Sequence, residues 1–188
     1  MNQKKNEVFT IRYVGGLSGP HKNAECLIEI ARILEVSGYE FKMEIGGGFP
    51  GKTGLPELVR KYGLKSVHFA GFIPDGDLRS FLAEADLFVY PSKYEGFGFP
   101  PLEAMACGTA TISSNAGSLG EVLGEGALTS NPDPIQLSNQ IMLVMDNPKL
   151  KRNMERVAVV QAEKYQWSTS AEQHIALFER ELANAKTS

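Results

Sequence analysis

Two glutamates, Glu95 and Glu103, flank a glycine-rich segment with seven residues between them. Carboxylates accept charge-assisted hydrogen bonds, so a pair that faces one cleft suits a ligand carrying several hydroxyl groups. Each side chain also has a plainer explanation: Glu95 can be a solvated loop residue, and Glu103 can be favoured by the dipole at a helix N-terminus. The glycines between them favour ligand binding, because glycine lets a backbone approach a bound molecule closely.

The same segment is typical of a turn that leads from a strand into a helix. Pro101 suits the first turn of a helix over 101–106, where the N–H that proline lacks has no helical partner anyway. The backbone amides around Gly98 and Phe99 would then face the open edge of a sheet, together with the positive end of the helix dipole. This arrangement predicts an anion site, with phosphate as the simplest ligand. The alternative is an ordinary capped turn.

A second glycine-rich loop leads to Lys22. Gly15 and Gly16 end an expected strand, and Lys22 stands at the N-terminal end of an expected helix, where the dipole disfavours a cation. Pairing with an anion such as a diphosphate explains this placement, and a merely solvated lysine is the alternative. The spacing matches neither the GxxxxGK[ST] motif nor the GxGxxG fingerprint.

Short apolar segments alternate with amphipathic ones along the chain. Strands are expected at 8–14, 41–45, 66–70, 87–90, 110–113 and 127–128, and helices at 22–37, 55–62, 75–85 (with Asp75 as N-cap), 101–106, 134–145, 148–164 and 168–183. This alternation predicts an α/β fold, a Rossmann-like parallel sheet flanked by helices. Ligands of such sheets bind beyond the carboxyl ends of the strands, and clustered glycines follow four of the strands.

Composition narrows the class of protein. The 188 residues suit one domain, and a net charge of −3 argues against a nucleic-acid partner. No apolar run approaches the ~20 residues of a membrane span, and the first residues lack the apolar core of a signal peptide, so we expect a cytoplasmic protein. Cys26 and Cys107 are expected to be buried free thiols, and the three scattered histidines predict no metal site.

The order of these motifs resembles the C-terminal, donor-binding domain of the GT-B-fold retaining glycosyltransferases of family 4, also called group 1. The E-x7-E signature of that family corresponds to residues 95–103, EGFGFPPLE, followed by AMACGT. The resemblance covers about residues 8–183. Further support comes from YVGGLS at 13–18 with Lys22 and Asn23, VHFAGFIP at 67–74, ADLFVYPS at 85–92, and Gly117 with Glu121 and Val122.

The resemblance implies that the glycosyl group of a nucleotide-diphosphate sugar passes to an acceptor hydroxyl with retention, without a metal or other cofactor. It implies two catalytic residues, Lys22 to stabilise the departing diphosphate and Glu95 to bind the sugar hydroxyls. The donor contacts it implies are Gly15 and Gly16 beside the diphosphate, Phe97 and Gly98 beside the sugar, Phe99 beside the diphosphate, Glu103 at the ribose and Ile73 near the base. One position departs from the family pattern, because many relatives carry arginine where this chain has Gly16.

The resemblance also implies a partner. Residues 1–188 would be a single nucleotide-sugar-binding domain, and the terminal helix within 165–188 would contact a missing N-terminal, acceptor-binding domain supplied in cis or in trans. The isolated chain would bind donor and transfer little sugar, and any peripheral membrane association would come through the missing half. A non-catalytic nucleotide-sugar-binding module or a subunit of a split enzyme remains the alternative. A GT-B sugar-nucleotide epimerase fits the E-x7-E context less well.

Overall fold

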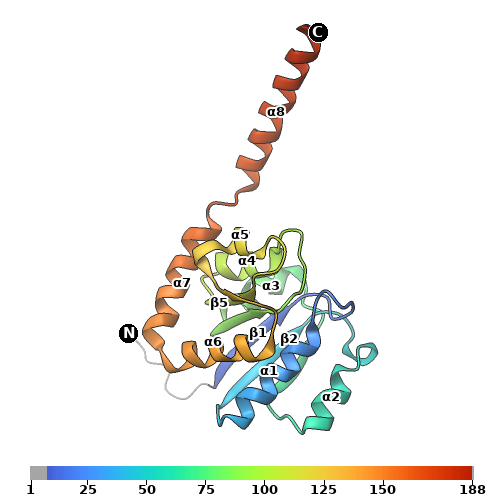
Figure 1. The fold of residues 1–188 in the computed structure, drawn as a ribbon, viewed down its shortest axis with the longest axis vertical. Coiled ribbons are helices and arrows are strands. Elements are labelled where there is room, and N and C mark those ends of the chain that lie inside the picture. Colours follow the sequence, from blue (N-terminus) through green and yellow to red (C-terminus); the bar gives the residue numbers. More distant parts are fainter. Residues whose placement is uncertain (1–7, 188) are drawn as a thin grey trace.

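Six parallel strands form one sheet in the computed structural model, which describes residues 8–187 (Figure 1). The spatial order is β3-β2-β1-β4-β5-β6, and all neighbouring strands pair in parallel. The strands are β1 (Phe9–Val14), β2 (Phe41–Gly46), β3 (Val67–Gly71), β4 (Leu87–Tyr90), β5 (Thr111–Ser114) and β6 (Leu128–Ser130). The strand order reverses between β1 and β4, so the predicted Rossmann-like fold is confirmed, and the crevice for a ligand is expected where these two strands end.

Helices connect the strands and cover the sheet. They are α1 (Ala24–Val36), α2 (Leu55–Tyr62), α3 (Asp75–Ala83), α4 (Phe99–Ala106), α5 (Leu119–Leu123), α6 (Pro134–Asp146), α7 (Pro148–Ala162) and α8 (Trp167–Thr187), with short 3-10 turns η1 (Pro50–Lys52) and η2 (Gly124–Gly126). α1 packs against α2 and α6, and α4 packs against α3 and α7. Every residue of β4 and β5 is buried, as expected of central strands covered on both faces.

The starts of α1 and α4 and the N-cap of α3 differ from the sequence prediction for reasons that the structure shows. α1 begins at Ala24, because Asn23 takes a left-handed conformation with φ 54° and ends the preceding turn. α4 begins at Phe99 rather than at Pro101, because Gly98 with φ 96° makes the turn into the helix. Asp75 is the first residue of α3 and not its N-cap, since Pro74 occupies the cap position and its carbonyl accepts from the amide of Asp77.

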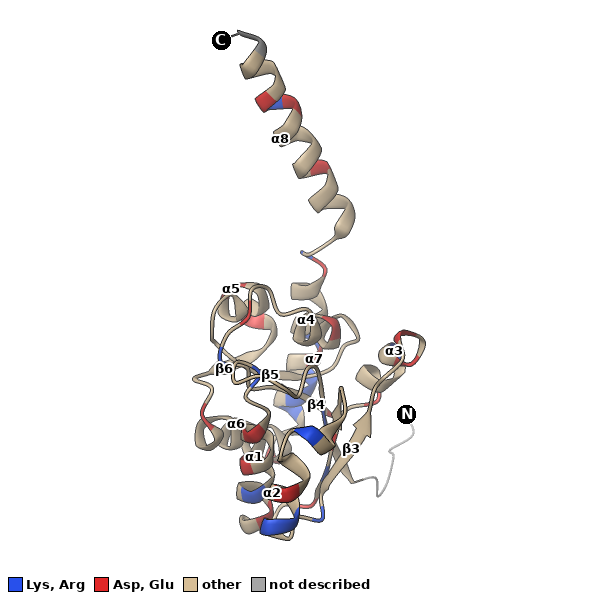
Figure 2. Cartoon of the chain, turned by 90° about the vertical axis from the view of Figure 1, so that its right-hand side faces the viewer, with Lys and Arg blue, Asp and Glu red and all other residues tan. Residues whose placement is uncertain are grey.

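The last helix stands clear of the domain. α8 projects away from the sheet in both views (Figures 1 and 2), and the side chains of residues 171–185 are all exposed. Apolar side chains recur along it at Ile175, Phe178 and Leu182. Within residues 8–187 no helix is both apolar enough and long enough to cross a bilayer.

Candidate functional site

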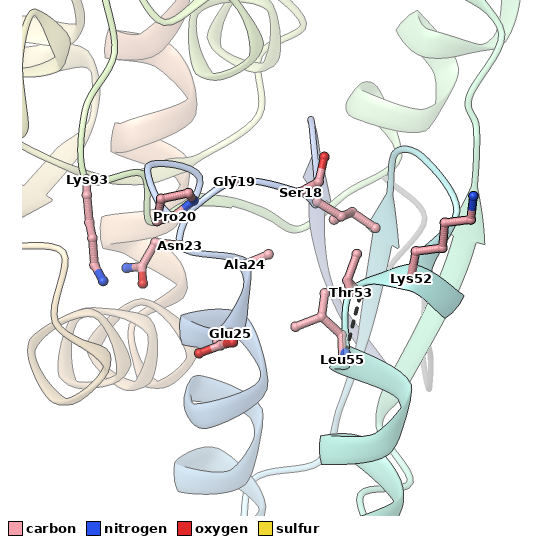
Figure 3. Close-up of a pocket in the computed structure, with 11 residues that line it drawn as sticks. Ser18, Gly19, Pro20, Asn23, Ala24, Glu25, Lys52, Thr53, Leu55 and Lys93 are labelled. Carbon is pink, nitrogen blue, oxygen red and sulfur yellow. Dashed lines mark hydrogen bonds between the residues drawn. The ribbon is translucent and has the colours of Figure 1, made fainter.

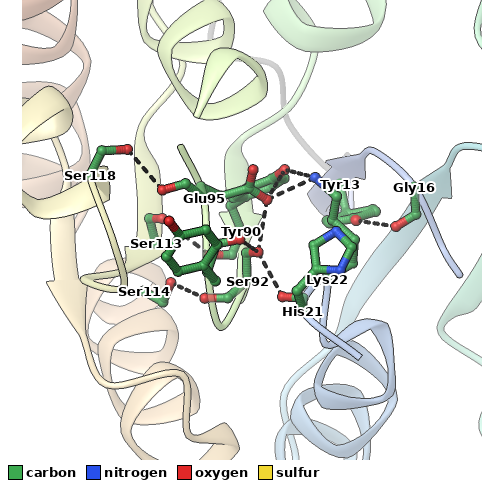
Figure 4. A network of polar contacts seen from close by, with 11 residues as sticks. Tyr13, Gly16, His21, Lys22, Tyr90, Ser92, Glu95, Ser113, Ser114 and Ser118 are labelled. Carbon is green, nitrogen blue, oxygen red and sulfur yellow. Dashed lines mark hydrogen bonds and ion pairs between the residues drawn. The ribbon is translucent and has the colours of Figure 1, made fainter. Parts of the chain in front are cut away.

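A polar network joins the ends of β1 and β4 (Figure 4). The Lys22 ammonium lies 2.8 Å from Oε1 of Glu95, and their side chains are only 22% and 13% exposed. The same carboxylate oxygen accepts from the Tyr90 hydroxyl at 2.9 Å and from the Ser92 hydroxyl at 2.8 Å. Lys22 also donates to the Tyr90 oxygen at 3.3 Å. The structure thus brings together the two residues predicted to be catalytic.

Two buried tyrosines form the floor under this network. Tyr13 on β1 and Tyr90 on β4 are nearly inaccessible to water, and their rings stack with centroids 5.6 Å apart. The Tyr13 hydroxyl donates to the carbonyl of Gly16 at 2.9 Å, whereas the Tyr90 hydroxyl donates to Glu95. The stacked pair therefore ties the glycine loop after β1 to the carboxylate after β4.

The loop that carries Lys22 is fastened to the loop after β4. The side chain of Asn23 donates to the carbonyls of Pro91 at 2.9 Å and of Pro132 at 3.3 Å. The carbonyl of His21 lies 2.8 Å from the Ser92 hydroxyl oxygen and accepts from the Lys93 amide at 2.6 Å. These bonds explain how a lysine and a glutamate that lie 73 positions apart in sequence meet in one ion pair.

The backbone of Glu95 is held from the opposite side by the loop after β5. The amide and the hydroxyl of Ser118 donate to the carbonyl of Glu95 at 3.2 and 3.1 Å. Gly117 lies directly against that carbonyl with φ 63°, and a Cβ there would clash with it. Glu95 is therefore fixed both through its side chain and through its backbone.

The surroundings of Glu95 keep it charged. Burial raises the pKa of this carboxyl, but hydrogen bonds from Lys22, Ser92 and Tyr90 outweigh burial and hold the pKa below its usual value. Burial and the negative charge of Glu95 raise the pKa of Tyr90 far above its usual value. Tyr90 therefore keeps its proton and acts as a donor to the carboxylate.

The second predicted glutamate lies close by but outside the network. Glu103 projects from the first turns of α4, and its carboxylate has no hydrogen bond or ion pair with any residue in the range 8–187. Partial burial, followed by the charge of Asp75, raises its pKa, and its own charge helps to raise that of Tyr90. Glu103 is thus an unpaired acceptor on the same side of the sheet end as Glu95.

The N-terminus of α4 offers fewer free amides than the sequence suggested. Because the helix begins at Phe99, Pro100 and Pro101 occupy its second and third positions and supply no N–H. The amide of Leu102 bonds to the carbonyl of Gly98 at 3.4 Å. The predicted anion contact at this helix therefore reduces to the amide of Phe99 and the amides of the loop before it.

The remaining predicted residues lie around the same sheet edge. A Cβ on Gly15 would lie 2.7 Å from the Tyr13 hydroxyl, so this glycine is required for packing. A Cβ on Gly16 would have space, because its nearest neighbours, side-chain atoms of Lys22, would lie 3.8 Å away. Ile73 packs over Gly46 at the end of β2. Of Gly15 and Gly16, only Gly16 would accept a Cβ without a clash.

Two hollows flank these loops. A groove of about 940 Å³ between α4 and the α7–α8 junction is lined by Phe97, Phe99 and Glu103 among others. A cavity of about 420 Å³ lies between the loop before α1 and the start of α2 (Figure 3), where the amide of Leu55 donates to the Thr53 hydroxyl at 3.3 Å. None of the predicted donor residues lines this second cavity.

The structure neither supports nor contradicts the prediction that the site works without a metal ion. Within residues 8–187 no three histidine, cysteine or carboxylate side chains gather in a way that could hold an ion. The site nevertheless contains residues that sequence reasoning missed: Tyr13, Tyr90, Ser92 and Ser118. For Tyr90 and Ser92 a signal existed, because polar side chains ended an otherwise apolar strand just before Glu95.

Comparisons with known proteins give a family match and several relatives for this chain. Residues 2–159 match the family described as "Glycosyl transferases group 1". The serotype-specific mannosyltransferase WbdA of Escherichia coli is 39% identical over 132 residues, which are 69% of this chain and 16% of that protein. The O-antigen chain mannosyltransferase B of Escherichia coli is 32% identical over 167 residues, or 87% of this chain and 44% of its own length. The chain therefore spans less than half the length of either relative.

A solved structure shows the same fold. The sucrose-phosphate synthase of Thermosynechococcus elongatus superposes with a TM-score of 0.85 at 26% sequence identity. The match covers 95% of this chain and 46% of that one. The Rossmann-like domain described above is therefore a part of a larger architecture in that protein.

Proposed function

We propose that this chain, which belongs to the group 1 glycosyl transferases, binds the nucleotide-diphosphate sugar from which such an enzyme transfers a glycosyl group. The observation that carries the proposal is the Lys22–Glu95 pair at the ends of β1 and β4. It places a cation suited to a diphosphate and a carboxylate suited to sugar hydroxyls within one hydrogen bond of each other. A leaving diphosphate is where charge develops, so Lys22 acts where stabilisation matters most.

The proposed roles follow from position. A Cβ on Gly16 would make only ordinary contacts with Lys22, 3.8 Å away, and the loop that ends at Phe99 follows β4, so we assign the backbone of both to the diphosphate. Glu103 is an unpaired carboxylate that can accept from the ribose hydroxyls. Ile73 follows β3 and packs over Gly46, the last residue of β2, and we assign this part of the sheet edge to the base. Lysine and amides replace a metal ion as the neutralising groups in this proposal.

The stereochemical outcome we propose is retention. The leaving diphosphate would help to take the proton of the incoming acceptor hydroxyl on the face from which it departs. Both relatives described above are named mannosyltransferases, so a mannosyl donor is the first to test. The acceptor would bind to a second domain in cis or in trans, because this chain covers under half of those relatives.

The test is a thermal-unfolding panel with UDP, GDP and ADP and with the hexose derivative of each. A ligand present at about 100 times its Kd should stabilise the fold by about 2.7 kcal/mol, a rise of roughly 5–10 °C for a domain of this size. We expect one base to be selected and the rise to disappear in Glu103→Ala. Glu125→Ala, which removes an exposed carboxylate on η2, serves as the matched control and should keep the rise.

The panel also separates the alternatives. If no nucleotide raises the midpoint of the unsubstituted chain, the proposed donor site is wrong for this chain. With a radiolabelled donor and water as the acceptor, we expect binding without any transfer. This result is expected of a half-site, because its open cleft does not exclude water. Efficient turnover by this chain alone would contradict the proposed need for a second domain.

A further inference from the structure

Two aromatic side chains at the α7–α8 junction rest on the loop 95–99, here called the donor loop. The ring of Tyr165 meets Phe97 edge to face, with centroids 5.6 Å apart and planes at 85°. The ring of Trp167, the first residue of α8, stacks on Phe99 at 5.9 Å with planes at 19°. Phe97 and Phe99 also touch each other at 4.8 Å, so the four rings form one continuous cluster.

The other side of the donor loop is closed by α5. Gly98 lies between the two phenylalanines with φ 96°, and a Cβ at this position would clash with the side chain of Leu119. The donor loop is thus clamped between Leu119 and the aromatic pair from the junction. A change in the position of Leu119 or of the two junction rings therefore moves the backbone amides of residues 97–99.

The junction itself is anchored at the end of α7. Gln161 is buried, and its side-chain amide donates to the carbonyl of Val122 at 3.0 Å while its carbonyl accepts from Lys164 at 2.7 Å. The amide of Tyr165 then bonds to the carbonyl of Ala162 at 3.0 Å. Tyr165 is therefore held by the body of the domain, whereas Trp167 belongs to the projecting helix.

Exposure shows that this cluster is not ordinary core. Trp167 is 78% exposed and Phe99 is 47% exposed, whereas core residues such as Leu27 and Ile112 are fully buried. A stack left this open stabilises the fold only a little, so its main consequence is local. It fixes the direction of Phe99 and, through Phe97, the path of the donor loop.

We propose that Tyr165 and Trp167 are positioning residues that hold the donor loop in the conformation that binds the sugar nucleotide. The position of α8 thereby affects the donor site. The inference rests on the proposed function, in which the amides of the donor loop contact the sugar and the diphosphate. Trp167 acts through Phe99, and Tyr165 acts through Phe97. Neither side chain needs to touch the ligand.

The chain contains a single tryptophan, so Trp167 reports on its own surroundings. Calorimetry of the full chain with the nucleotide selected in the thermal panel, and with its hexose derivative, gives binding independently of any fluorescence change. We expect saturating ligand to alter Trp167 emission excited at 295 nm. The change should be lost in Phe99→Leu, which removes the stacking partner. It should persist in Phe178→Leu, an aromatic deletion on the exposed part of α8.

Affinity tests the positioning role directly. We expect Trp167→Leu and Tyr165→Leu to weaken sugar-nucleotide binding by about three- to tenfold, the size suited to one aromatic pair. Trp167→Phe and Tyr165→Phe should restore it within about twofold, and thermal midpoints should stay close to that of the unsubstituted chain. Binding unchanged in both leucine variants, or lost only in proportion to a lowered midpoint, overturns the inference. Absence of any calorimetric binding in the unsubstituted chain overturns the proposed function and this inference with it.

Discussion

At the scale of single residues, the cation proposed for the diphosphate already has a partner. Lys22 is paired with Glu95 at 2.8 Å, and the pair is largely shielded from water. An incoming diphosphate must therefore compete with the carboxylate for Lys22. Tyr90 and Ser92 remain bonded to Glu95 when Lys22 leaves, so the carboxylate is not left without donors.

This competition predicts an unusual variant. Glu95→Gln removes the competing charge, so we expect nucleoside diphosphate to bind about three- to tenfold more tightly. The sugar derivative should gain less, because the variant also weakens the contacts proposed for the sugar hydroxyls. Calorimetry with both ligands measures the difference. Glu57→Gln, an exposed carboxylate paired with Arg60, controls for net charge and should change neither affinity.

The same carboxylate makes a prediction about pH. The pKa of Glu95 is lower in the folded chain than the ordinary value of 4.5, so its ionised form stabilises the fold above about pH 4.5, and this contribution is lost as the pH falls through the folded pKa. The free energy of unfolding in urea should therefore fall more steeply below pH 4.5 for the unsubstituted chain than for Glu95→Gln. Parallel curves would show that Glu95 titrates alike in both states. Glu29, Glu35 and Glu44 also have lowered pKa values, and their contribution cancels in this comparison.

At the scale of elements, the loop after β5 determines where Glu95 sits. Gly117→Ala would place a Cβ against the Glu95 carbonyl at a φ of 63°, so we expect a loss of at least about 1–2 kcal/mol of stability together with weaker donor binding. Gly120→Ala in α5 is the matched control. Its Cβ would lie 3.8 Å from its nearest neighbour, and alanine favours a helix by about 0.5–1 kcal/mol over glycine. Urea unfolding and calorimetry of both variants decide it, and equal behaviour would contradict the prediction.

Elements and site could be predicted to different depths from the sequence. The strands were predicted to within one or two residues because β4, for example, is an apolar run between Asp86 and Pro91. The short α5, η1 and η2 were missed, since three to five residues carry too little periodicity. The Lys22–Glu95 contact needs loops that are far apart in sequence to bond through Asn23 and Ser92, and no local pattern encodes such bonds.

At the scale of the whole molecule, the domain and α8 are unequal in their packing. The domain has a continuous buried core on both faces of the sheet, whereas the side chains of residues 171–185 in α8 are exposed. Most of the stability of a protein helix comes from packing its apolar face against a neighbour, and the exposed residues 171–185 have no such packing in this domain. The second domain proposed above would supply such a surface, and until it does, Ile175, Phe178 and Leu182 can pair with another copy of the chain.

A deletion of residues 171–188 separates these two roles of the helix. It keeps Trp167 and therefore the stack on Phe99, and the side chains of residues 171–185 that it removes are exposed. We expect the free energy of unfolding in urea to change by less than about 0.5 kcal/mol, because exposed side chains contribute little to stability. Sedimentation velocity should show that concentration-dependent association of the full chain is reduced in the shortened one. A larger loss of stability would mean that α8 folds back onto the domain in solution. In that case Phe178→Glu in the full chain would reduce association only by unfolding the protein.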